Sequence, residues 1–88
     1  MNAYDIKAIR EALGLSQLQF AQLMGVHPMT VSKWEREAAF PTDYQTAFLS
    51  QFQAAAKNKI DTDKLKNVLI VAGVIAALVL IFQTASKK

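Results

Sequence analysis

Hydrophobic residues recur at helical spacing through the first 57 residues of the chain. Ile6, Ile9 and Leu13 stand three and four residues apart, which is the spacing of one apolar helix face. Gly14 then favours a left-handed end to this segment, and Ser16 is a capping residue that can begin the next helix. The pattern predicts an all-α fold with four short helices at about 5–13, 17–24, 28–36 and 44–56.

The second and third of these predicted helices are joined by a very short turn. Gly25 can adopt a positive φ without steric cost, and Pro28 suits the first position of a helix because its missing N–H would be unpaired there. Two helices that cross closely need a small residue at the contact, and Ala21 stands at that position. We expect the buried frame of this helix pair to contain Leu18, Met24, Val26, Val31 and Trp34.

The last third of the chain has a different chemistry. A charged connector over 58–66 is followed by residues 67–86, which contain no charge. Twenty helical residues would be about 30 Å long, close to the thickness of a bilayer. The segment is apolar on every side and predicts a separate long hydrophobic helix. It has two main interpretations, a transmembrane anchor flanked by lysines or an oligomerisation helix, and a buried strand is a third.

Charge and composition restrict the classes of function. The net charge is +3, but residues 1–60 hold six Lys/Arg against five Asp/Glu, so the basic excess lies mostly in the C-terminal part. The chain has no cysteine, a single histidine, scattered carboxylates and no phosphate-binding glycine loop. These features argue against an enzyme, a metal site or a cofactor. The N-terminus lacks the apolar segment of a cleavable signal peptide.

The stretch LGLSQLQFAQLMGVHPMTVSKWER, residues 13–36, resembles the Cro/repressor-type (XRE-like) helix-turn-helix family of bacteria and their phages. The resemblance extends over about residues 4–56. It implies a compact domain of four to five helices that binds double-stranded DNA, usually as a dimer on a palindromic operator. The sequence departs from the family at Glu37, where glycine is common, and at Pro28, which replaces a polar residue.

The resemblance also implies roles for individual residues. It assigns a phosphate contact to Gln17, at the start of the second helix, and makes 28–36 the recognition helix in the major groove. Arg36 is expected to meet the DNA backbone or Glu35. The full DNA-binding set implied by the family is Gln17, His27, Pro28, Met29, Thr30, Ser32, Lys33 and Arg36.

The sequence therefore predicts a helix-turn-helix DNA-binding domain over 1–57, a connector over 58–66 and a hydrophobic helix over 67–86. The predicted function is a sequence-specific transcriptional regulator that acts as a homodimer or higher homo-oligomer, without a small-molecule ligand. A membrane-anchored scaffold whose helix-turn-helix binds a protein partner is the alternative. The helix-turn-helix domain is expected in the cytoplasm, either anchored in the inner membrane by 67–86 or soluble.

Overall fold

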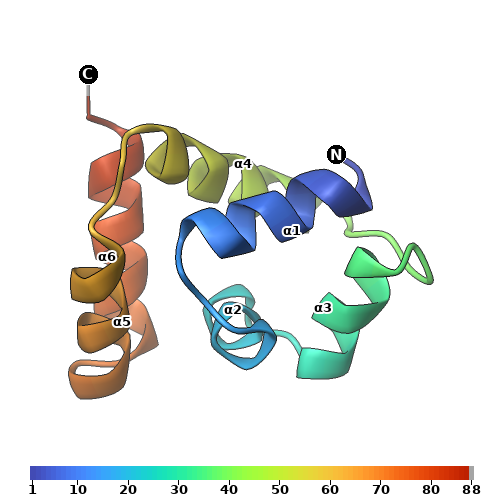
Figure 1. The fold of residues 1–88 in the computed structure, drawn as a ribbon, viewed down its shortest axis with the longest axis horizontal. Helices are drawn as coiled ribbons and strands as arrows, with labels where there is room; N and C mark the ends of the chain where they lie inside the picture. Colours follow the sequence, from blue (N-terminus) through green and yellow to red (C-terminus); the bar gives the residue numbers. More distant parts are fainter. Residues whose placement is uncertain (88) are drawn as a thin grey trace.

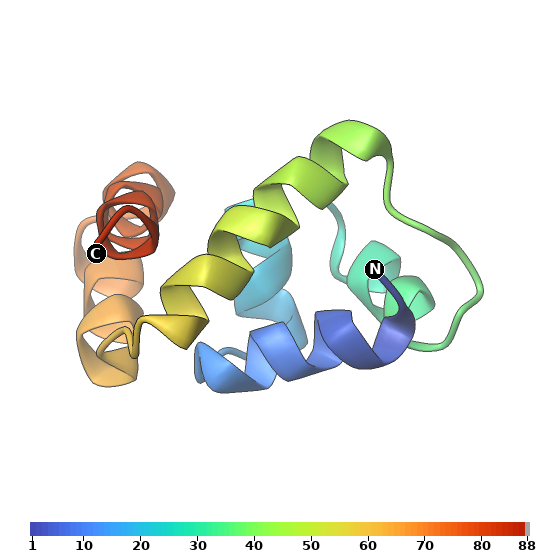
Figure 2. The ribbon, with the colours of Figure 1, turned by 90° about the horizontal axis from the view of Figure 1, so that it is seen from above.

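A computed structural model describes residues 1–87 of the chain. This part forms six helices around one hydrophobic core and contains no strand. Figures 1 and 2 show α3 at one end of the molecule and a hairpin of α5 and α6 at the other. The helices are α1 (Ala3–Ala12), α2 (Gln17–Met24), α3 (Pro28–Glu35), α4 (Asp43–Lys57), α5 (Thr62–Val71) and α6 (Val74–Ala85).

The first four helices begin where capping side chains dictate. The Gln19 N–H donates to Ser16 Oγ at 3.1 Å, while the Ser16 N–H donates to Gln19 Oε1 at 3.0 Å, so both unpaired donors are satisfied. Thr42 caps α4 in the same way. Asn2 and Asp5 form a third such box, and α1 therefore begins two residues earlier than the hydrophobic pattern predicts. The four helices predicted for residues 1–57 are confirmed.

The turn between α2 and α3 has the predicted geometry. Gly25 adopts a φ of 69°, and the Val26 N–H donates to the Ala21 carbonyl oxygen at 3.0 Å, which closes the end of α2. Ala21 and Trp34 are buried at the helix contact. Leu18, however, is more than half exposed, so its predicted place in the frame is wrong. Leu18 lies next to the side of α2 that faces the core, not on that side.

The prediction of one long hydrophobic helix over 67–86 is wrong. The segment turns back at Gly73, whose φ of 99° and ψ of −177° interrupt the helix and separate α5 from α6. The connector predicted over 58–66 is also partly helical, because the Asp61 side chain accepts from the Lys64 N–H and caps α5. A hairpin buries one face of each apolar helix, whereas a single straight helix would leave apolar surface in water on all sides.

The hairpin packs onto the helix-turn-helix domain. α6 contacts α2, α4 and α5. Leu65 and Ile81 are fully buried and belong to the same core cluster as the residues of α1 to α4. The Asn58 amide donates to the Thr84 carbonyl oxygen at 2.8 Å and so closes the last turn of α6. Among residues 1–87, no helix combines the length and the apolar character needed to cross a membrane. The expected membrane anchor therefore finds no support.

A close approach at the start of α5 joins the two regions. Gly14, in the turn between α1 and α2, has a φ of 72°, and a Cβ added there would lie 3.0 Å from the Cβ of Thr62. Real Cβ atoms rarely approach so closely, so the backbone at position 14 touches the first turn of α5. Glycine therefore suits this position both for its backbone angle and for its size.

A row of aromatic rings runs from the core to the surface. Phe20 packs edge-on against Phe52 at a centroid separation of 5.8 Å, and Phe52 packs edge-on against Phe48 at 6.1 Å. Phe48 in turn contacts Phe82 of α6 at 5.8 Å and Tyr44 at 5.4 Å. These contacts link α2, α4 and α6, and the last two rings lie at the molecular surface.

Candidate nucleic-acid interface

The outward side of α3 presents a compact row of side chains. Met29, Ser32, Lys33 and Arg36 follow one another at i, i+3, i+4 and i+7, so they share one side of the helix and its C-terminal cap. Met29, Lys33 and Arg36 are exposed and Ser32 is half-buried. Trp34 points the opposite way, into the core, and fixes the rotation of α3. These four residues are called the reading face below.

The N-terminal end of α3 is shaped by His27 and Pro28. The His27 Nδ1 atom accepts a hydrogen bond from the Met29 N–H at 3.0 Å, so the imidazole is the capping group of this helix. Pro28 occupies the first helical position, as predicted. Thr30 is half-buried and lies to one side of the reading face. Within residues 1–87 there is no group of three His, Cys, Asp or Glu side chains able to hold a metal ion.

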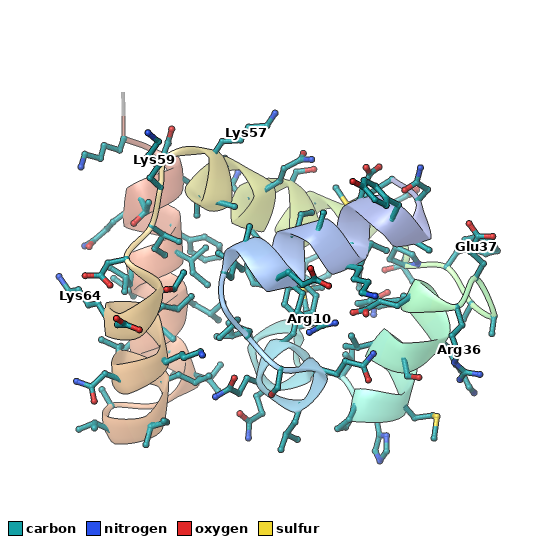
Figure 3. All side chains as sticks on the ribbon, in the orientation of Figure 1. Arg10, Arg36, Glu37, Lys57, Lys59 and Lys64 are labelled. Carbon is teal, nitrogen blue, oxygen red and sulfur yellow. The ribbon has the colours of Figure 1, made fainter. Side chains whose placement is uncertain are left out.

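Arg36 lies along the reading face and not toward Glu35. Its Nε donates to the Ser32 Oγ at 3.2 Å and to the Ser32 carbonyl oxygen at 3.3 Å. Its Nη2 lies 4.0 Å from the Met29 sulfur. The alternative that Arg36 pairs with Glu35 is therefore wrong. Figure 3 shows Arg36 at the outer edge of the molecule, where its guanidinium stays accessible.

Glu35 instead binds Arg10 of α1. Arg10 Nε donates to Glu35 Oε2 at 2.8 Å and Arg10 Nη2 donates to Glu35 Oε1 at 3.0 Å, which is a two-pronged ion pair. The third nitrogen donates to the Leu15 carbonyl oxygen at 3.0 Å. The two charged side chains are only 14 % and 6 % exposed. The hydrogen bonds to Glu35 raise the pKa of the Arg10 guanidinium above its ordinary value, although burial acts in the opposite direction.

Gln17 belongs to this same group of side chains. Its Nε2 donates to Glu35 Oε1 at 3.3 Å, so the first residue of α2 is joined to the last residue of α3. Arg10, Gln17 and Glu35 therefore link α1, α2 and α3, and Figure 3 shows Arg10 pointing into the space between these helices. The Arg10–Glu35 pair could not be predicted from the sequence, because the two residues are 25 positions apart and no periodicity relates them.

Glu37 occupies a position that strains an ordinary residue. Its φ of 60° lies in the left-handed region, just after the end of α3. Glu37 is a departure from the Cro/repressor-type family that the sequence resembles, in which glycine is common here, and the left-handed backbone gives a physical reason for that glycine. Figure 3 shows the Glu37 carboxylate pointing away from the molecule, beyond the end of α3.

Three lysines of the C-terminal part of the chain lie far from α3. Figure 3 places Lys57, Lys59 and Lys64 around the end of α4 and the start of α5, at a distance from the reading face. The cations of the reading face are Lys33 and Arg36. Its charge is therefore modest, and the basic excess of the C-terminal part does not add to it.

Comparison with known proteins identifies the helix-turn-helix and nothing further. No significant match exists among curated proteins or among solved structures. The one family match begins in α1 and ends just before α4, and it covers less than half of the 88 residues. It supports a DNA-binding regulator of the Cro/repressor type in general. Residues 6–42 match the sequence model of a helix-turn-helix family, which is where the structure has α1, α2 and α3.

Proposed function

We propose that this protein is a sequence-specific DNA-binding regulator that acts as a homodimer, with α3 in the major groove. The observation that carries the proposal is the reading face, in which the half-buried Ser32 lies between the exposed Met29, Lys33 and Arg36 on the helix that follows the turn. A helix presented in this way fits the width of the major groove, where base edges differ in their donors and acceptors.

Each side chain of the reading face has a chemistry suited to DNA. Lys33 can donate to the guanine acceptors or to a phosphate, and the Met29 side chain can pack on a thymine methyl group. Ser32 and Arg36 can donate to phosphate oxygens. The N-terminus of α2 offers unpaired N–H groups to a phosphate next to Gln17. The His27 ring contributes mainly by capping α3.

The modest charge of the reading face is the reason to propose a dimer. Phosphate contacts supply much of the affinity of DNA-binding proteins, and two exposed cations are few for one half-site. A second copy would place a second α3 in the major groove about 34 Å, or a multiple of this distance, along the duplex. The two weak contacts would then act together through their high effective concentration.

The test is a salt titration of binding to short genomic DNA fragments by the full chain. We expect binding at about 50 mM salt that weakens steeply as salt increases, because bound phosphates release counterions. Replacing Lys33 by alanine should lower the affinity several-fold. It should also reduce the slope of the logarithm of the binding constant against the logarithm of the salt concentration by about one unit. Lys64→Ala is the matched control, because it removes an exposed lysine at the opposite end of the molecule.

Two results would contradict the proposal. One is the absence of any binding at about 50 mM salt, where electrostatic attraction is strong. The other is an equal loss of affinity for Lys33→Ala and Lys64→Ala, which would indicate a non-specific effect of total charge. Either result would leave the alternative in which the helix-turn-helix binds a protein partner.

A further inference from the structure

An apolar surface without a partner lies where α6 crosses α4. Ile75, Val79 and Phe82 follow one another at i, i+4 and i+7 along the outward side of α6. Ile75 is 81 % exposed, and Tyr44 on the neighbouring helix is 74 % exposed. A shallow groove of about 240 Å³ lies between the two helices. We call this surface the α4–α6 face; it consists of Tyr44, Ala47, Phe48, Gln51, Ile75, Val79 and Phe82.

The aromatic side chains of this face pack on one another and on the core. Phe48 packs on the buried Phe52, and both Tyr44 and Phe82 pack on Phe48. Side chains that are already ordered lose little entropy when they are covered. Exposed aromatic groups of this kind are typical of the centres of protein–protein interfaces.

The size and the charge of the face indicate what covers it. Four large apolar side chains of the face, Tyr44, Ile75, Val79 and Phe82, are exposed, and a group of exposed apolar side chains is typical of a protein–protein contact. Ile70 and Val71, in the hairpin just before α6, are exposed as well and extend the apolar surface that a second copy could cover. None of the seven residues is charged, although the chain carries a net charge of +3. Covering this face with a second copy would therefore bury no unpaired charge, and the centres of protein–protein interfaces are depleted in charged residues.

We propose that the α4–α6 face is where a second copy of this chain docks, through a two-fold symmetric interface. In such an interface the Ile75 side of one copy faces the Tyr44–Phe82 groove of the other, and the reverse holds by symmetry. Figures 1 and 2 place α6 at the opposite end of the molecule from α3, so docking there leaves both reading faces uncovered. This proposal rests on the dimer of the proposed function, but it does not require DNA binding.

Sedimentation equilibrium of the purified full chain, without DNA, tests the proposal. We expect a dimer at about 100 µM, and a dissociation constant raised at least about 100-fold by the pair of substitutions Ile75→Lys and Tyr44→Lys. Both side chains are exposed, so the substitutions leave the core intact and the circular dichroism spectrum unchanged. Tyr4→Lys is the matched control, because Tyr4 is 80 % exposed on α1, outside the face, and its substitution should leave the dimer unaffected.

Three outcomes would overturn the proposal. They are a monomeric wild-type chain at this concentration, a dimer that the paired substitution does not weaken, and a dimer that Tyr4→Lys weakens equally. Flotation with vesicles containing phosphatidylglycerol adds a further check. Binding of a monomer to these vesicles that is lost in the paired variant would assign the face to lipid. A stable dimer that fails to bind DNA would uphold this proposal while refuting the proposed function.

Discussion

The helix-turn-helix region and the α5–α6 hairpin are held in place by different kinds of contact. In the first region, capping boxes begin α1, α2 and α4, and the ion pair of Arg10 and Glu35 joins α1 to α3. The hairpin relies on apolar burial, and α6 begins at Gly73 without a side-chain cap. Its main directional contact with the domain is the hydrogen bonding of Asn58 to the end of α6.

This difference matters because directional contacts fix orientation, whereas apolar contacts mainly fix proximity. A two-pronged ion pair and a capping box each accept a narrow range of geometry. The helix that presents the reading face is therefore held at a defined angle. The hairpin is positioned mainly by apolar packing, together with the Asp61 cap of α5 and the hydrogen bonds of Asn58 to the end of α6. Three substitutions probe this comparison, in order of decreasing effect on stability.

Replacing Arg10 by methionine should destabilise the protein most. The substitution leaves the Glu35 carboxylate buried with only Gln17 as a partner, and breaking a buried pair from one side costs about 3 kcal/mol or more. We expect a lower free energy of unfolding in urea. The slope of this free energy against urea concentration should not change, because both regions share one core and unfold together.

Lys7→Met is the control for this experiment. It removes a lysine whose Nζ lies 3.9 Å from Glu11 on the exposed side of α1, and such pairs contribute less than about 0.5 kcal/mol. An equal decrease in the free energy of unfolding of both variants would show that Arg10 stabilises the protein by helix propensity alone. A biphasic transition in Arg10→Met would show that the hairpin folds independently of the first region.

Replacing Gly73 by alanine should break the hairpin at its turn. Its φ of 99° and ψ of −177° belong to a region of backbone conformation that is open almost only to glycine. We therefore expect the free energy of unfolding, measured by heat or urea, to fall by about 2 kcal/mol. A Cβ at this position meets nothing within 4 Å, so the loss comes from the backbone.

Gly25→Ala is the matched comparison in the helix-turn-helix region. Its backbone is left-handed with equally open surroundings, and alanine there should cost about 1 kcal/mol. An unchanged stability of Gly73→Ala, with increased helical signal, would show that residues 62–85 tolerate a continuous helix.

Replacing Glu37 by glycine should stabilise the protein slightly. Glycine adopts a φ of 60° without strain, so we expect a gain of up to about 1 kcal/mol and a higher midpoint of thermal unfolding. Lys59→Gly, with a φ of 57° in the loop before α5, should give a similar gain because the strain is again confined to the backbone. A decrease in the midpoint for both variants would contradict this explanation.

The sequence was informative wherever the determinants of structure are local. Ser16, Gly25 and Pro28 each act on the adjacent turn, so the limits of α2 and α3 could be predicted closely. The break at Gly73 could not be predicted in this way. Apolar residues surround it on both sides, and their pattern is equally compatible with one helix or two. The choice between them depends on the surface that α4 offers to α6, which is a property of the whole fold.

In the candidate site, too, features set by local sequence could be predicted, whereas contacts between distant residues could not. The exposed row on α3 follows from the helical period once Trp34 is assigned to the core, and so the exposure of Met29, Lys33 and Arg36 could be anticipated. The partner of Glu35 could not be anticipated, because Arg10 reaches it across the fold from another helix. The uncovered α4–α6 face was equally hidden, since it forms only when α6 folds back onto α4.

The close approach of Gly14 to Thr62 sets a limit for protein engineering. The side chains of the reading face can be exchanged without touching that contact, because none of them is among the atoms nearest to position 14. A side chain at position 14, by contrast, would have to displace Thr62 by a few tenths of an ångström and adopt a left-handed backbone. A redesign of the exposed side of α3 that keeps Gly14 would therefore preserve the contact between the α1–α2 turn and α5.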